Sequence, residues 1–266
     1  MKDLVRALRG ECEVLNALVG ALPAKDWERR TAFFDWSVAD EIMHLHLVDL
    51  FTLQTLRDPE VFLATFREVR EAQARGIELS AQMRARFGHL TPAQLLEVWR
   101  GTWTELCNLL ESEAPKRRVR WFGPDMSVRS VPNARQMEVW AHGQDVFDLF
   151  RLRRQNTDSI YNICDLGVRT FQWSFQNRGE PVPESPPQVK LVAPCGALWT
   201  WNAGAVQLIH GSAEDFALVV TQRRNIADTR LRVEGGEARR WMQIAQCFAG
   251  APETPPAPGV RVVSTP

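Results

Sequence analysis

Hydrophobic and polar residues follow a helical period over the first 178 residues of the chain. In residues 3–20, apolar side chains recur every three or four positions and so share one helix face: Leu4, Leu8, Cys12, Leu15 and Val19. A second helix is predicted to begin after Ser37, an N-cap with Asp40 three positions further on, and to end near Arg57.

The same spacing predicts four more helices and one long loop. The helices are expected at residues 60–87, 92–113, 132–152 and 158–177, with the loop at 114–131. Thr91 and Pro92 supply an N-cap and a first-turn proline. Residues 1–178 are therefore predicted to form an all-helical domain.

The pattern changes at residues 179–187, which are too rich in proline to continue a helix. We place a domain boundary there. Short β-like runs follow at 188–193, 197–201 and 205–209, and then an amphipathic stretch at 213–223, a strand at 229–234 and a helix at 237–248. The predicted fold class is α+β: residues 188–250 form a small α+β domain, and 251–266 form a proline-rich tail.

Composition excludes several classes of partner. The 32 basic residues equal the 32 acidic ones, so no net field favours nucleic acid or an anionic membrane, and a small-molecule partner is the default. The five cysteines are widely spaced and form no CxxC pair, which favours a reducing compartment. Charges interrupt the N-terminal apolar residues, and no run of apolar residues is long enough for a membrane span. We therefore expect a soluble, cytoplasmic protein.

Candidate chemistry begins with EVWAHGQDVFDLF, where Glu138 and His142 lie four residues apart in a predicted helix. Such residues share a helix face, and carboxylate and imidazole are ligands of zinc, nickel and iron. The spacing alone is weak evidence, because composition predicts about 0.6 such acid–histidine pairs and two occur. A solvated or ion-paired helix face is the alternative, although the apolar neighbours of this pair favour burial and so a partner.

A third histidine lies far away in the sequence. His44 has apolar neighbours in its predicted helix, as a hydrogen-bonded core histidine would. Asp40, one turn before His44, and Asp145, one turn after His142, could orient the two rings as outer carboxylates.

Together these segments resemble the DinB-like superfamily, in the branch of mycothiol-dependent maleylpyruvate isomerase and its metal-binding relatives. The resemblance rests on WSVADEIMHL at residues 36–45, on Glu138-x-x-x-His142-Gly143-x-Asp145, and on the α+β C-terminal part. It implies an N-terminal four-helix bundle whose core binds a divalent metal, most commonly zinc, through His44, Glu138 and His142. It also implies a low-molecular-weight thiol cofactor such as mycothiol, bacillithiol or glutathione.

The resemblance extends to residues 213–223, which are similar to a helix whose terminal arginine faces the site in the isomerase branch. Arg223, or its neighbour Arg224, would then bind an anionic group of the substrate or the thiol. A surface arginine is the alternative.

The leading hypothesis is a metal-dependent, thiol-dependent transferase or isomerase acting on a small molecule. The competing hypothesis is a non-catalytic protein that binds metal structurally or binds a small ligand. A third is a buried hydrogen-bond network of His44, Glu138 and His142 without an ion. A homodimer is compatible with each of them.

Overall fold

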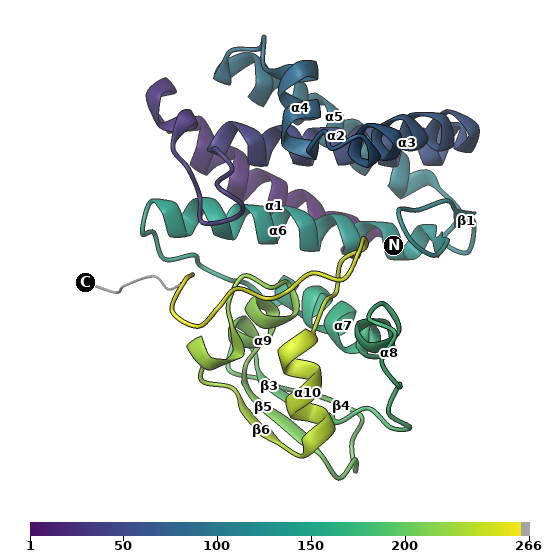
Figure 1. Ribbon diagram of the computed structural model, residues 1–266, viewed down its shortest axis with the longest axis vertical. Helices are drawn as coiled ribbons and strands as arrows, with labels where there is room; N and C mark the ends of the chain where they lie inside the picture. The colour runs from purple at the N-terminus through teal and green to yellow at the C-terminus, as the bar shows by residue number, and fades with distance from the viewer. Residues whose placement is uncertain (262–266) are drawn as a thin grey trace. The chain divides into compact units, whose positions relative to one another are not determined.

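The computed structural model describes residues 1–261 and divides into two compact units, one comprising Met1–Leu149 and the other beginning at Phe150 (Figure 1). The first unit is helical and the second combines helices with a small sheet. This confirms the predicted α+β class.

Four long helices form the bundle of the first unit: α1 (Lys2–Gly20), α2 (Val38–Arg57), α5 (Pro92–Ser112) and α6 (Val131–Leu149). Both α1 and α2 pack against α5 and α6, so the helices enclose one shared core. The predicted capping at Ser37 is confirmed, because its side chain accepts from the backbone of Asp40 and the Asp40 carboxylate accepts from the backbone of Ser37.

Two shorter helices, α3 (Pro59–Ala74) and α4 (Leu79–Phe87), pack on α2. The sequence predicted one continuous helix here, which was wrong. Gly76 adopts φ = +82°, a left-handed conformation that glycine reaches without strain and that ends the first helix. The loop between α5 and α6 contains the short antiparallel pair β1 (Arg118–Val119) and β2 (Met126–Ser127).

A buried ion pair joins two bundle helices in the core. Nε of Arg135 in α6 lies 2.9 Å from Oδ1 of Asp49 in α2, and the indole nitrogen of Trp99 in α5 donates to Oδ2 at 3.1 Å. The three side chains are almost fully buried. Since a buried charge is tolerated only with a partner, this contact fixes how α2 and α6 lie against each other.

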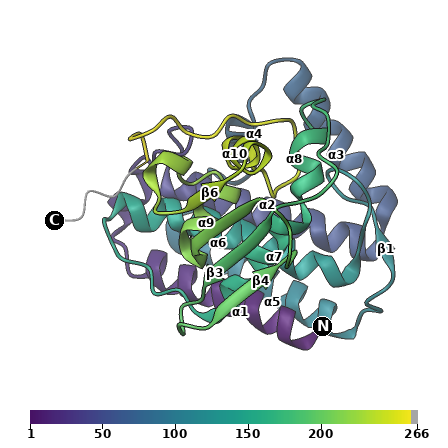
Figure 2. The same ribbon diagram turned by 90° about the horizontal axis from the view of Figure 1, so that it is seen from below.

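The second unit contains a four-stranded mixed sheet with the order β4-β3-β5-β6. Its strands are β3 (Gln188–Val192), β4 (Leu198–Trp201), β5 (Leu208–Ser212) and β6 (Arg232–Glu234), and they lie side by side in Figure 2. β3 and β5 are parallel, and the other pairs are antiparallel. The third predicted strand, 205–209, is shifted to Leu208–Ser212 because Ser212 caps the helix that follows directly.

Helices of the second unit pack on this sheet and on one another: α7 (Tyr161–Arg169), α8 (Phe171–Gln176), α9 (Ala213–Val220) and α10 (Gly236–Ile244). α7 packs on α9 and α8 packs on α10. The boundary predicted near residue 178 therefore moves to Leu149, because residues 158–177 bury their apolar faces within the second unit. The proline-rich stretch connects two elements of one unit, and part of the predicted tail, 262–266, lies outside the described residues.

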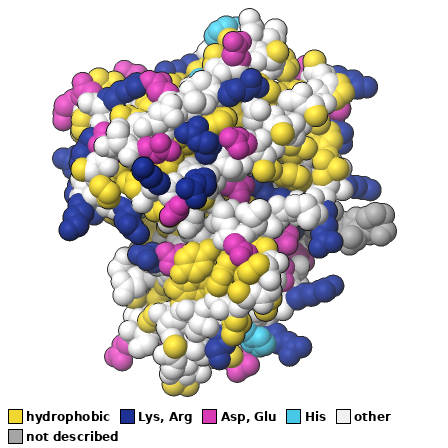
Figure 3. Space-filling view, turned by 180° about the vertical axis from the view of Figure 1, so that it is seen from behind, with side chains coloured by type: hydrophobic (Ala, Val, Ile, Leu, Met, Phe, Trp, Pro, Cys, Tyr) yellow, Lys and Arg dark blue, Asp and Glu magenta, His cyan; other side chains and the backbone are white. Residues whose placement is uncertain are grey.

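The surface has mixed charge. Basic and acidic side chains are interspersed on the face shown in Figure 3, in keeping with their equal numbers in the sequence. Within the described part of the chain, no helix is both long and apolar enough to cross a lipid bilayer.

Candidate metal centre

α2 and α6 bring together the three side chains that the resemblance implied as ligands. Nε2 of His44 and Nε2 of His142 each lie 3.4 Å from the same oxygen, Oε2 of Glu138. One ligand atom from each residue lies within 4.8 Å of the other two. Residues 94 positions apart in the chain thus converge at one point.

The two separations from Glu138 fit ligands of one tetrahedral ion. Hydrogen bonds between nitrogen and oxygen usually measure about 2.7–3.2 Å, so 3.4 Å is long for a direct contact. Zinc ligands lie about 2.0–2.2 Å from the ion, which places neighbouring ligand atoms of a tetrahedron about 3.4 Å apart. Two imidazoles and one carboxylate are also a donor set that zinc, nickel and iron accept. The residues present therefore fit a divalent metal and leave a coordination position for another ligand.

A second carboxylate lies behind one of the rings. Oε2 of Glu41 lies 2.6 Å from Nδ1 of His142, and the other oxygen of Glu41 accepts from the hydroxyl of Thr31 at 2.8 Å. In this geometry Nδ1 donates to the Glu41 carboxylate, and Nε2 is the ring nitrogen that faces Glu138. Nε2 can donate to Glu138 when the ring is an imidazolium, or give its lone pair to a metal ion that Glu138 also binds.

Aromatic rings cover the two histidines. The Trp36 ring stacks on His142 with 5.9 Å between centroids and 12° between planes, and it lies 5.3 Å from the His44 ring. Phe33 meets His142 edge-on at 5.2 Å. Both aromatic residues come from the turn before α2, which Thr31 closes by donating its backbone N–H to the carbonyl of Trp36 at 2.7 Å.

The site is buried on one side and partly accessible on the other. The side chains of Glu41 and His142 are 0% and 4% exposed, whereas those of His44 and Glu138 are 14% and 22% exposed. Burial raises the pKa of Glu138, but hydrogen bonds and positive charge from His142 and His44 outweigh it and hold the pKa well below its usual value. Glu138 is therefore an anion at neutral pH, as a metal ligand must be.

The two predicted outer carboxylates have different surroundings. A ligand oxygen of Asp145 lies within 4.8 Å of those of Glu41 and His142, so Asp145 is close to the ring it was expected to orient. Asp40 instead accepts from Ser37 and receives Nε and Nη2 of Arg84, each at 2.7 Å. Asp40 therefore does not orient His44, whose Nδ1 is buried and has no hydrogen-bond partner among the described residues.

Arg223 lies in the second unit. It follows the end of α9 by three residues, where its Nη1 donates to the carbonyl of Thr221 at 3.1 Å. Its backbone N–H and that of Arg224 both donate to the carbonyl of Leu218. Recognition of an anion by Arg223 stays a prediction.

Sequence reasoning did not identify Glu41, Thr31 or the covering role of Trp36 and Phe33. Glu41 could have been noticed as an acid on the same helix face as His44, three positions before it. Its actual partner, His142, lies on another helix, and no local spacing indicates that contact.

Known proteins place the chain among relatives of similar length. Two uncharacterized proteins of Mycobacterium tuberculosis, one of them from strain CDC 1551 / Oshkosh, are each 38% identical over 249 residues. The match covers 93% of this chain and 96% of each relative. The shared sequence therefore spans both units.

The fold also resembles solved structures. A crystal structure of the mycothiol-dependent maleylpyruvate isomerase superposes with a TM-score of 0.53 at 13% identity, covering 82% of this chain and 87% of that one. A histidine-to-alanine mutant of that isomerase matches equally well. At this identity the likeness concerns the fold, and it agrees with the expected DinB-like architecture. Residues 8–147 match the family described as Mycothiol maleylpyruvate isomerase N-terminal domain, and the chain belongs to that family.

Proposed function

We propose that the protein is a divalent-metal enzyme that uses a low-molecular-weight thiol to isomerise a small molecule or to transfer the thiol to it. The observation that carries this proposal is the convergence of His44 and His142 on Glu138, each 3.4 Å from the same carboxylate oxygen, with Glu41 behind the buried ring. Zinc is the ion we infer, because its tetrahedral geometry matches these separations.

Three protein ligands leave one coordination position open, as in catalytic rather than structural zinc sites. When bound there, a divalent ion supplies Lewis acidity that lowers the pKa of a coordinated thiol, so that thiolate is available at neutral pH. The thiol we infer is mycothiol, which the family description and the name of the structurally similar isomerase both include.

Each surrounding residue has a defined task in this proposal. Glu41 holds the proton on Nδ1 of His142 and so keeps Nε2 free to coordinate. Glu138 supplies the negative charge that balances the ion. Trp36 and Phe33 limit access of water to the rings and strengthen the electrostatic interactions among the ligands. The partly exposed side of His44 and Glu138 is where thiol and substrate would enter.

The test combines metal analysis with thermal shifts. Purified protein is stripped with a chelator and titrated with zinc, nickel and iron(II), and the bound metal is counted. Each form is then melted with mycothiol, bacillithiol or glutathione. One equivalent of metal, followed by further stabilisation by one thiol, is the expected result, since ligands of the native state raise the melting temperature.

Variants separate catalysis from the competing hypotheses. His142→Ala should lose the stoichiometric ion, and His89→Ala, at an exposed histidine outside the site, should retain it. A cobalt(II)-loaded protein should gain a sulfur-to-metal charge-transfer absorption when the thiol binds. Metal binding without any thiol response would favour a non-catalytic metal protein, and an absence of metal in the wild type would leave the buried hydrogen-bond network.

A further inference from the structure

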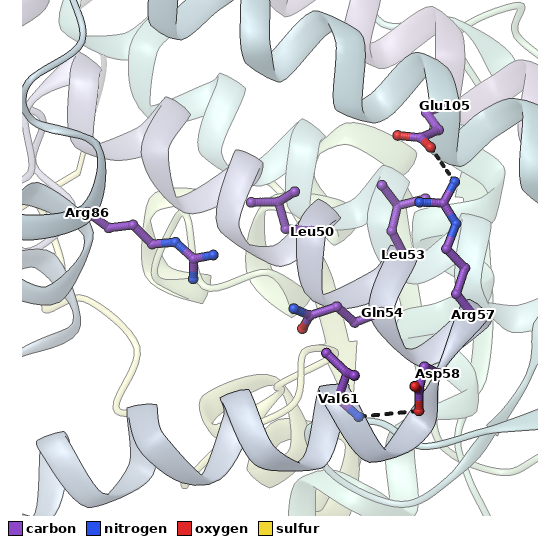
Figure 4. A pocket seen from close by; sticks show the side chains of 8 residues that line it. All are labelled: Leu50, Leu53, Gln54, Arg57, Asp58, Val61, Arg86 and Glu105. Atoms are coloured by element: carbon purple, nitrogen blue, oxygen red, sulfur yellow. Dashed lines mark hydrogen bonds and ion pairs between the residues drawn. The ribbon is translucent and has the colours of Figure 1, made fainter.

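The first unit contains a cavity of about 310 Å³, and none of its lining residues belongs to the metal centre. Its walls come from α2, α3, α4 and α5, and its apolar surface is contributed by Leu50, Leu53 and Val61 (Figure 4). The volume lies at the lower end of the range of about 300–1,000 Å³ for ligand pockets. At about 30 Å³ for each water-sized group, it accommodates on the order of ten non-hydrogen atoms.

Most charged groups around this cavity already have partners. Arg57 pairs with Glu105 across the α2–α5 wall, as Figure 4 shows. The carboxylate of Asp58 caps α3 by accepting from the backbone of Glu60 at 3.1 Å and of Val61 at 3.4 Å. These groups close the rim and are not free to bind a ligand.

Two polar groups remain. Arg86 of α4 is exposed and makes no hydrogen bond or ion pair with any described residue, and its guanidinium lies 5.3 Å from the centre of the Phe87 ring. Figure 4 shows its guanidinium directed toward Leu50 and Gln54. Oε1 of Gln54 is buried and lacks a hydrogen-bond partner among the described residues. A buried acceptor without a donor is unfavourable, so a ligand that donates to it would be stabilised.

We propose that this cavity binds a small amphipathic carboxylate. The apolar body lies against Leu50, Leu53 and Val61, the carboxylate pairs with Arg86, and a hydroxyl on the ligand donates to Gln54. The guanidinium sets the sign of the ligand's charge, because the remaining charges on the rim neutralise one another or cap a helix. The size limits the chain to about eight carbons, by the same volume estimate.

The test uses full-length, chelator-treated protein and a matched pair of probes, octanoate and octylammonium, in calorimetric titrations. Octanoate should bind saturably at one site and octylammonium at least about tenfold more weakly, since charge-assisted pairing is lost. Arg86→Gln should weaken octanoate about tenfold. Arg67→Gln, at an exposed arginine of α3 that does not line the cavity, should leave the affinity unchanged.

Two further measurements test the space inside the cavity and the role of the Gln54 amide. Val61→Trp places a ring in the cavity from an exposed position and should abolish octanoate binding while the melting curve stays cooperative. 3-Hydroxyoctanoate should bind more tightly than octanoate to the wild type and equally to Gln54→Leu. The proposal is overturned if octanoate shows no saturable binding, or if Arg86→Gln and Val61→Trp both bind it as the wild type does. His142→Ala should bind octanoate normally, so failure here is distinct from failure of the metal proposal.

Discussion

Nδ1 of His142 and Oε2 of Glu41 lie 2.6 Å apart, although the two residues are 101 positions apart in the sequence. The Glu41 carboxylate is fully buried and also accepts from Thr31. A ring held from behind in this way presents its other nitrogen in one tautomer and one orientation. Metal affinity should therefore depend on a residue that does not touch the ion.

We expect Glu41→Gln to lower zinc affinity about tenfold and Glu41→Ala to lower it up to about a hundredfold, the usual range for loss of an outer carboxylate. Competition with a chromophoric chelator measures the change. Asp40→Asn is the matched control, because Asp40 pairs with Ser37 and Arg84. It should lower the melting temperature and leave zinc affinity unchanged. Equal zinc affinity in wild type and Glu41→Ala would exclude this role for Glu41.

The sequence predicted only part of the site. Spacing identified Glu138 and His142 as neighbours on a helix face, and the family resemblance supplied His44. Asp40 was expected beside His44 because it lies one turn earlier, but the capping box and Arg84 hold its carboxylate elsewhere. Contacts between helices depend on rotation and register, which local patterns do not specify.

The pair of Asp49 and Arg135 provides a stability test. Arg135→Met leaves the Asp49 carboxylate buried with the Trp99 indole as its hydrogen-bond donor, and we expect a loss of roughly 3–5 kcal/mol in unfolding free energy. The double variant Arg135→Met/Asp49→Leu should recover much of that loss because no unpaired charge remains. Denaturant titrations give both values.

An exposed pair is the control for that experiment. Arg57 and Glu105 are each about half exposed, with side-chain exposures of 52% and 51%. Arg57→Met should therefore cost no more than about 1 kcal/mol. If it cost as much as Arg135→Met, burial would not be the reason for the difference.

His46 should make stability depend on pH. Burial, with a contribution from the positive charge of Arg86, lowers the pKa of His46 from 6.5 to about 4. The folded state thus binds fewer protons than the unfolded state between these values. The unfolding free energy is therefore unaffected by His46 above pH 6.5. It falls as the pH drops from 6.5 toward 4, by about 3 kcal/mol in total.

Chelator-treated wild type and His46→Leu, unfolded in denaturant at several pH values, provide the measurement. The variant should show a shallower fall in unfolding free energy between pH 6.5 and 4. His89→Leu, at an exposed position, should retain the wild-type slope. Parallel slopes for wild type and His46→Leu would show that His46 titrates normally in the folded protein.

The fold was predicted best where a local signal determines it. The caps at Ser37 and Thr91 and the apolar period placed the starts of the bundle helices. The domain boundary was misplaced because a proline-rich stretch marks the end of a helix and carries no information about which helices pack together. Membership of residues 158–177 in the second unit depends on long-range burial.

The close packing of α7 against α9 requires a glycine at position 167. A Cβ on Gly167 in α7 would lie 2.8 Å from Cγ2 of Val220 and 3.1 Å from Cε1 of Phe216, both in α9. Gly167→Ala should therefore destabilise the second unit by about 1–3 kcal/mol, despite the better helix propensity of alanine. Gly101→Ala in α5, where nothing lies within 4 Å, should instead stabilise the protein by up to about 1 kcal/mol.

The double variant Gly167→Ala/Val220→Ala removes the contact partner and should be more stable than the sum of its single variants predicts. Strict additivity in thermal unfolding would mean that α7 and α9 do not pack closely at Gly167.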